Sequence, residues 1–212
     1  MWELVKAGGW LMLPLVLCSI FTVAITIERM IRLKKSMILP KALLLNQTQN
    51  AHAVMQQLRQ DEALKGSTLG RIFTAGYQSK NQNEQYARAQ MEVTASQEIG
   101  YLEKNINFLG TLSAVAPLLG LLGTVLGIIE SFLVIDLGTN SNPTLMIPGI
   151  SKALITTAAG MFIAIPALFA YRYFQRLVQE YVAELEQQST LFHAALFYQN
   201  STVEEQDLRK AG

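Results

Sequence analysis

The chain has 212 residues, of which half are hydrophobic and 16% are charged, and its formal net charge is +1. This composition is too apolar for an ordinary soluble domain and too charged for a chain lying wholly in lipid, so we expect part membrane and part cytoplasm. The near-neutral charge gives no electrostatic case for nucleic-acid binding. A single cysteine, Cys18, excludes both a disulfide framework and a multi-cysteine metal site within one chain.

Three apolar runs are long enough to cross a bilayer as helices, which takes roughly 20 residues because hydrocarbon offers the backbone no hydrogen-bond partner. The first extends from Gly9 to Ile27, the second from Asn105 to Ile129 and the third from Ile147 to Tyr171, interrupted by Lys152. The predicted fold class is therefore an all-α membrane protein with three transmembrane helices and long cytoplasmic helical extensions.

Basic residues are distributed unevenly around these runs. Lys6 precedes the first, eleven lie between the first and second, none lies between the second and third, and four follow Tyr171. Because Lys and Arg remain on the cytoplasmic side, we expect the N-terminus outside the membrane, the C-terminus in the cytoplasm, and Trp10 at the outer interface. The first run could also be a secretory signal, but its positive charges follow it and no small-residue cleavage site precedes Glu28, which favours a retained anchor.

This topology predicts seven segments. They are an N-terminal periplasmic segment (1–8), transmembrane helix 1 (9–27), a cytoplasmic helical domain (28–104), transmembrane helix 2 (105–129), a periplasmic loop (130–148), transmembrane helix 3 (149–171) and a cytoplasmic helical tail (172–212).

Residues 36–104 are rich in Ala, Gln, Leu, Glu and Lys, which favours helices. We expect helices at 40–64, at 67–79 and from about 84 into the second span, with breaks at Gly66–Ser67 and Lys80–Asn83. The outer loop has a turn-rich stretch, and Pro148 can open the third helix. The polar run from Glu204 to Lys210 is typical of a disordered end.

The third span is expected to continue into the cytoplasm as one long helix. An apolar stripe at helical spacing marks this extension and could be a partner-binding surface, although a core seam against residues 36–104 is the simpler interpretation. The stripe consists of Phe174, Val178, Tyr181, Leu185 and Phe192.

Enzyme and metal motifs are absent from the sequence: there is no phosphate loop, nucleophile elbow or zinc-protease motif. His52 and His193 lie in predicted soluble helices and are expected to be ordinary surface or core residues. We therefore expect no catalysis, no metal site and no cofactor.

The second span carries Gly120, Gly123 and Gly127, which clear one side of the helix so that another helix backbone can approach closely. Pro117 frees the carbonyl of Ser113, so local irregularity is expected there. In the third span Gly160 is a further small residue at the expected packing face.

Hydroxyl groups occur in both of these spans without any carboxylate. They belong to Ser113 and Thr124 in the second span and to Thr156 and Thr157 in the third. The general expectation is that such hydroxyls bond the carbonyl groups of their own helix.

Two segments, APLLGLLGTVLGII at 116–129 and GISKALITTAAGMFIAIPA at 149–167, resemble the MotA/TolQ/ExbB proton-channel family. Three spans, an outer N-terminus and a large cytoplasmic loop are similar to the ExbB and TolQ branches, whereas MotA-type flagellar stators have four spans. The resemblance is closest to the ExbB branch.

The resemblance implies a pentameric homo-oligomer whose second and third spans line a pore around the single transmembrane helices of an ExbD-like partner. That partner would supply a transmembrane Asp, which fits the absence of Asp and Glu from all three predicted spans. Thr124 and Thr157 match the family's pore threonines, and Thr156 and Ser113 are weaker candidates. A TonB-like protein would carry the output.

Lys152 departs from the family pattern, because many ExbB and TolQ chains have Glu at this position. The lysine could snorkel to the outer interface, pair with an acidic group on a partner, or disfavour cation entry.

The function that the resemblance implies is a proton-channel stator subunit coupling the proton motive force to TonB-dependent transport across the outer membrane. One alternative is a TolQ-like subunit acting with TolR and TolA in envelope integrity. Another is a non-conducting membrane scaffold, for which the glycine faces and long helices would suffice.

Overall fold

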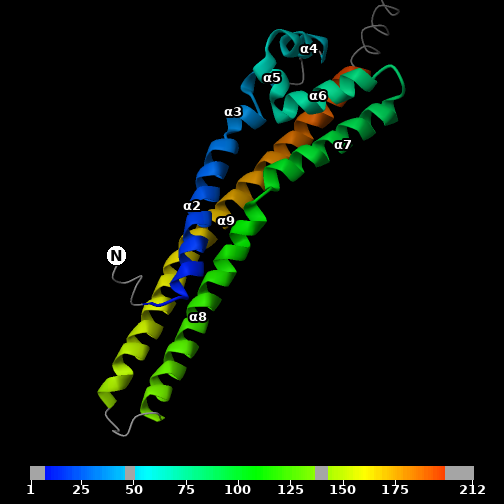
Figure 1. Cartoon of the computed structure of the whole chain (residues 1–212). Coiled ribbons are helices and arrows are strands. Elements are labelled where there is room, and N and C mark those ends of the chain that lie inside the picture. Colours follow the sequence, from blue (N-terminus) through cyan, green and yellow to red (C-terminus); the bar gives the residue numbers. More distant parts are fainter. Residues whose placement is uncertain (1–7, 46–50, 137–142, 199–212) are drawn as a thin grey trace, which may run out of the picture. The chain divides into compact units, whose positions relative to one another are not determined.

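A computed structural model describes residues 8–45, 51–136 and 143–198 (Figure 1). Every regular element in these ranges is a helix. Lys6, the turn-rich stretch around Gly138 and the polar end at 204–210 lie outside the described residues, so the expectations about them stay predictions. The chain divides into two compact units, residues 1–29 with 105–175 and residues 30–104 with 176–212.

The first unit contains the apolar helices α2 (Met12–Arg32), which extends beyond it, and α8 (Ile106–Asp136), the short helix η2 (Pro143–Met146), and the first half of α9 (Ile147–Phe197). Its core joins the three long helices through Met12 and Leu15 of α2, Ala116 of α8 and Ala164 of α9. Large apolar side chains elsewhere on these helices are exposed, as at Leu13, Leu118 and Phe162, which suits contact with lipid.

Three helical stretches are long and apolar enough to cross a membrane: Met12–Arg32, Glu84–Leu133 and Thr144–Phe197. The 51-residue α9 is one continuous helix, which confirms the expected extension of the third span. It begins at Ile147, so Pro148 lies in its first turn, where a missing N–H costs nothing.

The second unit contains α3 (Lys35–Ile38), η1 (Lys41–Leu43), α4 (Ala51–Gln60), α5 (Glu62–Gly66), α6 (Thr68–Ser79), α7 (Glu84–Glu103) and the end of α9. The expected breaks at Gly66–Ser67 and Lys80–Asn83 are confirmed. Each has a capping residue, because Ser67 Oγ accepts from Gly70 N at 3.1 Å and Asn83 Oδ1 accepts from Gln85 N at 2.9 Å.

The expected single helix at 40–64 is wrong. Pro40 and Leu44 have extended backbones, so only the short η1 forms between them. Asp61 separates α4 from α5 because its carboxylate accepts from Ala63 N at 2.8 Å and caps a new helix. Local side-chain bonding therefore interrupts the helix.

The apolar stripe of α9 is buried, with Val178, Tyr181, Leu185 and Phe192 each at most 6% exposed. The Phe192 ring stacks on Phe73 of α6 with centroids 4.1 Å apart. These four residues are thus part of the core of the second unit, as the simpler interpretation predicted, whereas Phe174 is buried in the first unit.

Lys35 and Glu184 form an ion pair in the second unit, with Nζ 2.8 Å from Oε2. The hydrogen bond to Glu184 raises the pKa of the exposed Lys35 above its ordinary value.

The expectation of one helix running from about residue 84 into the second span is also wrong. Helix α7 ends at Glu103 and α8 begins at Ile106, because Asn105 adopts a left-handed backbone with φ of 64°. Asparagine tolerates this conformation better than most residues. Its side-chain amide also donates to Glu28 Oε2 at 3.0 Å, which fixes the turn to α2.

Asn105→Ala should therefore lower the free energy of unfolding by about 1–2 kcal/mol, because alanine pays the left-handed penalty and loses the amide hydrogen bond. Asn105→Gly keeps the backbone conformation and should cost less. Thermal unfolding of the purified proteins in detergent measures the stability of the two variants. A glycine variant at least as destabilised as the alanine variant would contradict this prediction.

Candidate functional site

The part of the α8–α9 contact nearest the connection between the two helices is built from glycines. A Cβ added at Gly123 would collide with the Thr156 hydroxyl and lie 2.6 Å from Thr156 Cβ. A Cβ added at Gly127 would lie 2.7 Å from the carbonyl oxygen of Gly149. No real Cβ atom fits such spaces, so glycine is required for the two backbones to come this close.

The same contact continues along both helices. A Cβ at Gly120 would lie 3.0 Å from Thr157 Cα, and a Cβ at Gly160 would lie 2.6 Å from the carbonyl oxygen of Ala116. The predicted close approach is therefore an antiparallel packing of α8 and α9 within one chain. Pro117 lies within α8, which stays helical across it, so the expected irregularity is not a break in the helix.

Three of the four candidate hydroxyls bond their own helix, as generally expected. Thr124, Thr156 and Ser113 donate to the carbonyl oxygen three residues earlier, at 2.7, 2.9 and 2.7 Å. Thr156 is 1% exposed and lies against Gly123, whereas Thr124 and Ser113 are partly exposed. Thr156 is thus sealed between the two helices, while Thr124 retains an accessible side.

Thr157 differs because its hydroxyl donates across the helix pair to the carbonyl oxygen of Gly120, at 3.0 Å. Gly120 allows the approach, since its missing side chain leaves its backbone next to Thr157. Thr157 is partly exposed, so its oxygen keeps lone pairs that could accept a further hydrogen bond.

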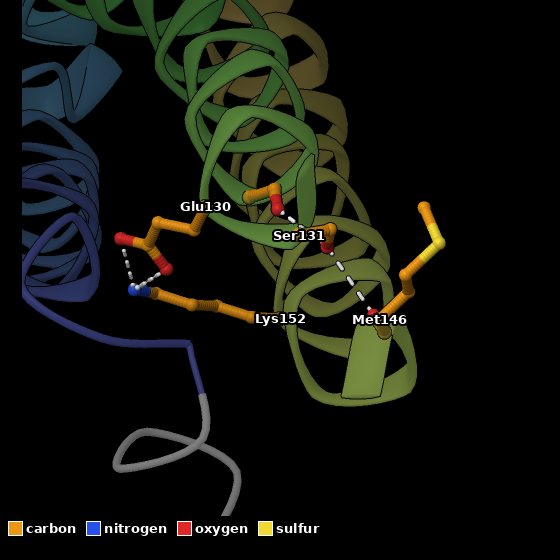
Figure 2. Close-up of polar contacts among 5 residues, drawn as sticks. Glu130, Ser131, Met146 and Lys152 are labelled. Atoms are coloured by element: carbon orange, nitrogen blue, oxygen red, sulfur yellow. Dashed lines mark hydrogen bonds and ion pairs between the residues drawn. The ribbon is translucent and has the colours of Figure 1, made fainter. Parts of the chain in front are cut away.

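Lys152 forms an ion pair with Glu130 of the same chain, as Figure 2 shows. Its Nζ donates to both carboxylate oxygens, at 2.9 Å to Oε1 and 2.8 Å to Oε2. The Lys152 side chain is 24% exposed and that of Glu130 is 50% exposed. Of the three alternatives that the sequence left open for Lys152, the structure shows pairing with an acidic group. The acidic group belongs to the same chain rather than to a partner.

Ser131 adds a polar contact beside this pair (Figure 2). Its hydroxyl lies 2.9 Å from the carbonyl oxygen of Gly127 and 3.2 Å from that of Met146, so it links α8 to η2. Glu130 and Ser131 were not predicted as site residues. The sequence does contain a signal for the ion pair, because Glu130 is the first charged residue after the second span and Lys152 lies near the start of the third.

The sequence of the chain matches a known protein family. The model of the MotA/TolQ/ExbB proton channel family matches residues 65–187, more than half of the chain. The chain belongs to the MotA/TolQ/ExbB proton channel family. The match includes all of α8 and most of α9, and it confirms the resemblance drawn from residues 116–129 and 149–167.

Curated relatives carry the names of both the ExbB and TolQ branches. The putative biopolymer transport protein ExbB-like 1 of Synechocystis is 31% identical over 206 residues, covering 91% of this chain and 78% of the relative. The Tol-Pal system protein TolQ of Haemophilus influenzae is 36% identical over 50% of this chain and 49% of its own length. The biopolymer transport protein ExbB of Salmonella typhimurium is 40% identical over 40% of this chain and 35% of its own length.

Family membership and the three apolar helices make the chain an ExbB/TolQ-type proton-channel subunit and a multi-pass protein of the bacterial inner membrane. Proteins of this family are channel and transport components rather than enzymes.

The two histidines lie beside aromatic side chains. His52 Nδ1 is 3.3 Å from the hydroxyl of Tyr77, and the ring centroid of His193 is 5.1 Å from that of Phe197. Within the described residues, no group of three or more His, Cys, Asp or Glu side chains could hold a metal ion.

Proposed function

We propose that the chain is the ExbB-type subunit of an inner-membrane motor that couples the proton motive force to TonB-dependent transport across the outer membrane. One observation carries the proposal: the spans contain accessible hydroxyl groups but no carboxylates. Thr124 and Thr157 retain exposed surface on α8 and α9, yet no charged residue occurs in 106–129 or 153–171.

A proton relay through a membrane needs a group that gains and loses a proton, and threonine does not titrate. The titratable group must therefore come from another chain. A single-span ExbD-like partner with an Asp in its helix would meet this need, and Thr124 and Thr157 would hydrogen-bond that Asp or order water beside it. Exposed apolar side chains on α2, α8 and α9, such as Leu13, Leu118 and Phe162, support the proposal of contacts with such a partner and with four further copies of this chain in a pentamer.

The proposed orientation places the N-terminus in the periplasm, residues 28–104 and the tail in the cytoplasm, and the 130–148 loop in the periplasm. The eleven basic residues of 28–104 and their absence from 130–148 support it. The ion pair of Glu130 and Lys152 would then lie at the periplasmic end of the helix pair.

A TolQ-type role, acting with TolR and TolA in envelope integrity, is the second candidate, because a TolQ relative is 36% identical over half of this chain. Deleting the gene in its own host separates the two. Loss of iron–siderophore uptake is the result expected for an ExbB-type subunit, whereas detergent sensitivity with outer-membrane blebbing would assign the TolQ role. A deletion strain with neither defect would favour the non-conducting scaffold and overturn the motor proposal.

A further inference from the structure

The glycine face that joins α8 to α9 does not by itself define how far one helix is shifted along the other. Gly120, Gly123 and Gly127 recur about once per helical turn, so sliding α9 by one turn, about 5.4 Å, would place Thr156 opposite another glycine. Small residues give close approach but little discrimination between such registers. Directional polar contacts must supply the discrimination.

The ion pair of Lys152 and Glu130 has the required geometry. It joins α9 to α8 with both carboxylate oxygens engaged, so a one-turn slide would separate the two charges by roughly the length of that slide. The Lys152 side chain is also enclosed from a third side. A Cβ at Gly9, whose φ is +73°, would collide with Lys152 Cε and lie 2.9 Å from Nζ.

We propose that Lys152 and Glu130 form a register clasp, a positioning pair that fixes α9 on α8. The clasp keeps Thr156 on Gly123 and the Thr157 hydroxyl on the carbonyl oxygen of Gly120. Lys152 is one turn from Thr156 on the same helix, so a shift of the clasp moves both threonines equally. The consequence for proton flow rests on the proposed function, whereas the clasp itself does not.

The distance between two spin labels tests the register directly, in the full chain reconstituted into lipid and diluted with unlabelled copies, in a Cys18→Ser background that removes the native thiol. The labels are carried by cysteines at Leu118 of α8 and Leu154 of α9, whose side chains are 62% and 65% exposed, so no atom is added to the close glycine contact. The distance found in the chain with an intact ion pair reports the native register. A second distance, which appears when α9 slides by one turn of about 5.4 Å, reports the shifted register.

We expect Lys152→Gln and Glu130→Gln each to lower the ratio of native to shifted label distances by about two- to fivefold, the effect of losing a partly exposed charge pair. Lys152→Arg keeps the positive charge and should leave the ratio unchanged. The exchanged pair Lys152→Glu/Glu130→Lys should restore the ratio that the single glutamine variants lose. Glu180→Gln is the matched control, because the described ion pair of Glu180 is with Arg176 of the same helix. An unchanged ratio in both glutamine variants, or an exchange that restores nothing, would overturn the clasp.

Proton-driven work in strains that carry the same Lys152 and Glu130 variants distinguishes this proposal from the proposed function. If the ratio of label distances follows the clasp and proton-driven work falls with it, both proposals are supported. If the ratio follows the clasp while work is unchanged, the clasp is supported and the threonine role in proton flow is overturned.

Discussion

Thr157→Val should lower proton-driven work by about 10- to 100-fold while the complex still assembles, because a hydrogen bond to a charged group contributes roughly 1.5–3 kcal/mol. Valine has nearly the shape of threonine but cannot donate to the carbonyl oxygen of Gly120 or accept from a partner carboxyl group. Thr124→Val should have an effect in the same direction. Uptake or envelope integrity in the deletion strain, restored by the variant gene, measures the loss.

Thr156→Val is the matched control for these variants. Thr156 is 1% exposed and bonds only the carbonyl oxygen of Ala153 among the described contacts, so it should tolerate the loss of its hydroxyl. Partner recovery on purification confirms that each variant assembles. Normal work in assembled Thr157→Val and Thr124→Val complexes would exclude the pore role of both threonines.

Gly123→Val should destabilise the chain by about 3 kcal/mol or more, because overpacking by even a small group costs about 1–3 kcal/mol and valine adds three carbon atoms. The first of them would already collide with the Thr156 hydroxyl and lie 2.6 Å from Thr156 Cβ. The two helices would have to separate, which also breaks the Thr157 hydrogen bond. Thermal unfolding in detergent, together with the amount of protein in membranes, measures the effect.

Gly100→Ala is the control for this change, because among the described residues no heavy atom beyond its chain neighbours and its own helix backbone lies within 4 Å of the position that its Cβ would take. Removing glycine from a helix should there be neutral or stabilising by about 0.5–1 kcal/mol. Moving the small residue to the other helix, as Gly123→Ala/Thr156→Gly, should recover part of the stability that Gly123→Ala alone loses. Equal melting temperatures for Gly123→Val and the unsubstituted chain would contradict the close packing of α8 on α9.

The helix-packing residues were predictable from sequence because their cause is local. Glycines one turn apart in an apolar run have few uses other than close helix approach, and Gly120, Gly123 and Gly127 all lie against α9. The breaks at Gly66–Ser67 and Lys80–Asn83 were predictable for the same reason, since the side chains that cap the next helices there act on a backbone N–H two or three residues away.

Features that depend on a distant partner were not predictable. The left-handed backbone of Asn105 is stabilised by a bond to Glu28, 77 residues earlier, and nothing near Asn105 in sequence indicates it. For Lys152, pairing with an acidic group on another protein was one of three alternatives, and pairing within the chain was not among them. The antiparallel hairpin that brings Glu130 to Lys152 has to be folded before the two meet. The roles of Thr124 and Thr157 stay predictions, since they concern a chain that these residues would face.

The central claim is that another protein supplies the titratable group of the proton path, because the three spans of this chain contain no carboxylate. Purification of the tagged chain from its native membranes tests this claim most directly. We predict recovery of a small single-span protein whose transmembrane helix contains an Asp, in a complex with several copies of this chain. Recovery of a stable complex that contains no second protein with an acidic residue in its span would contradict the account.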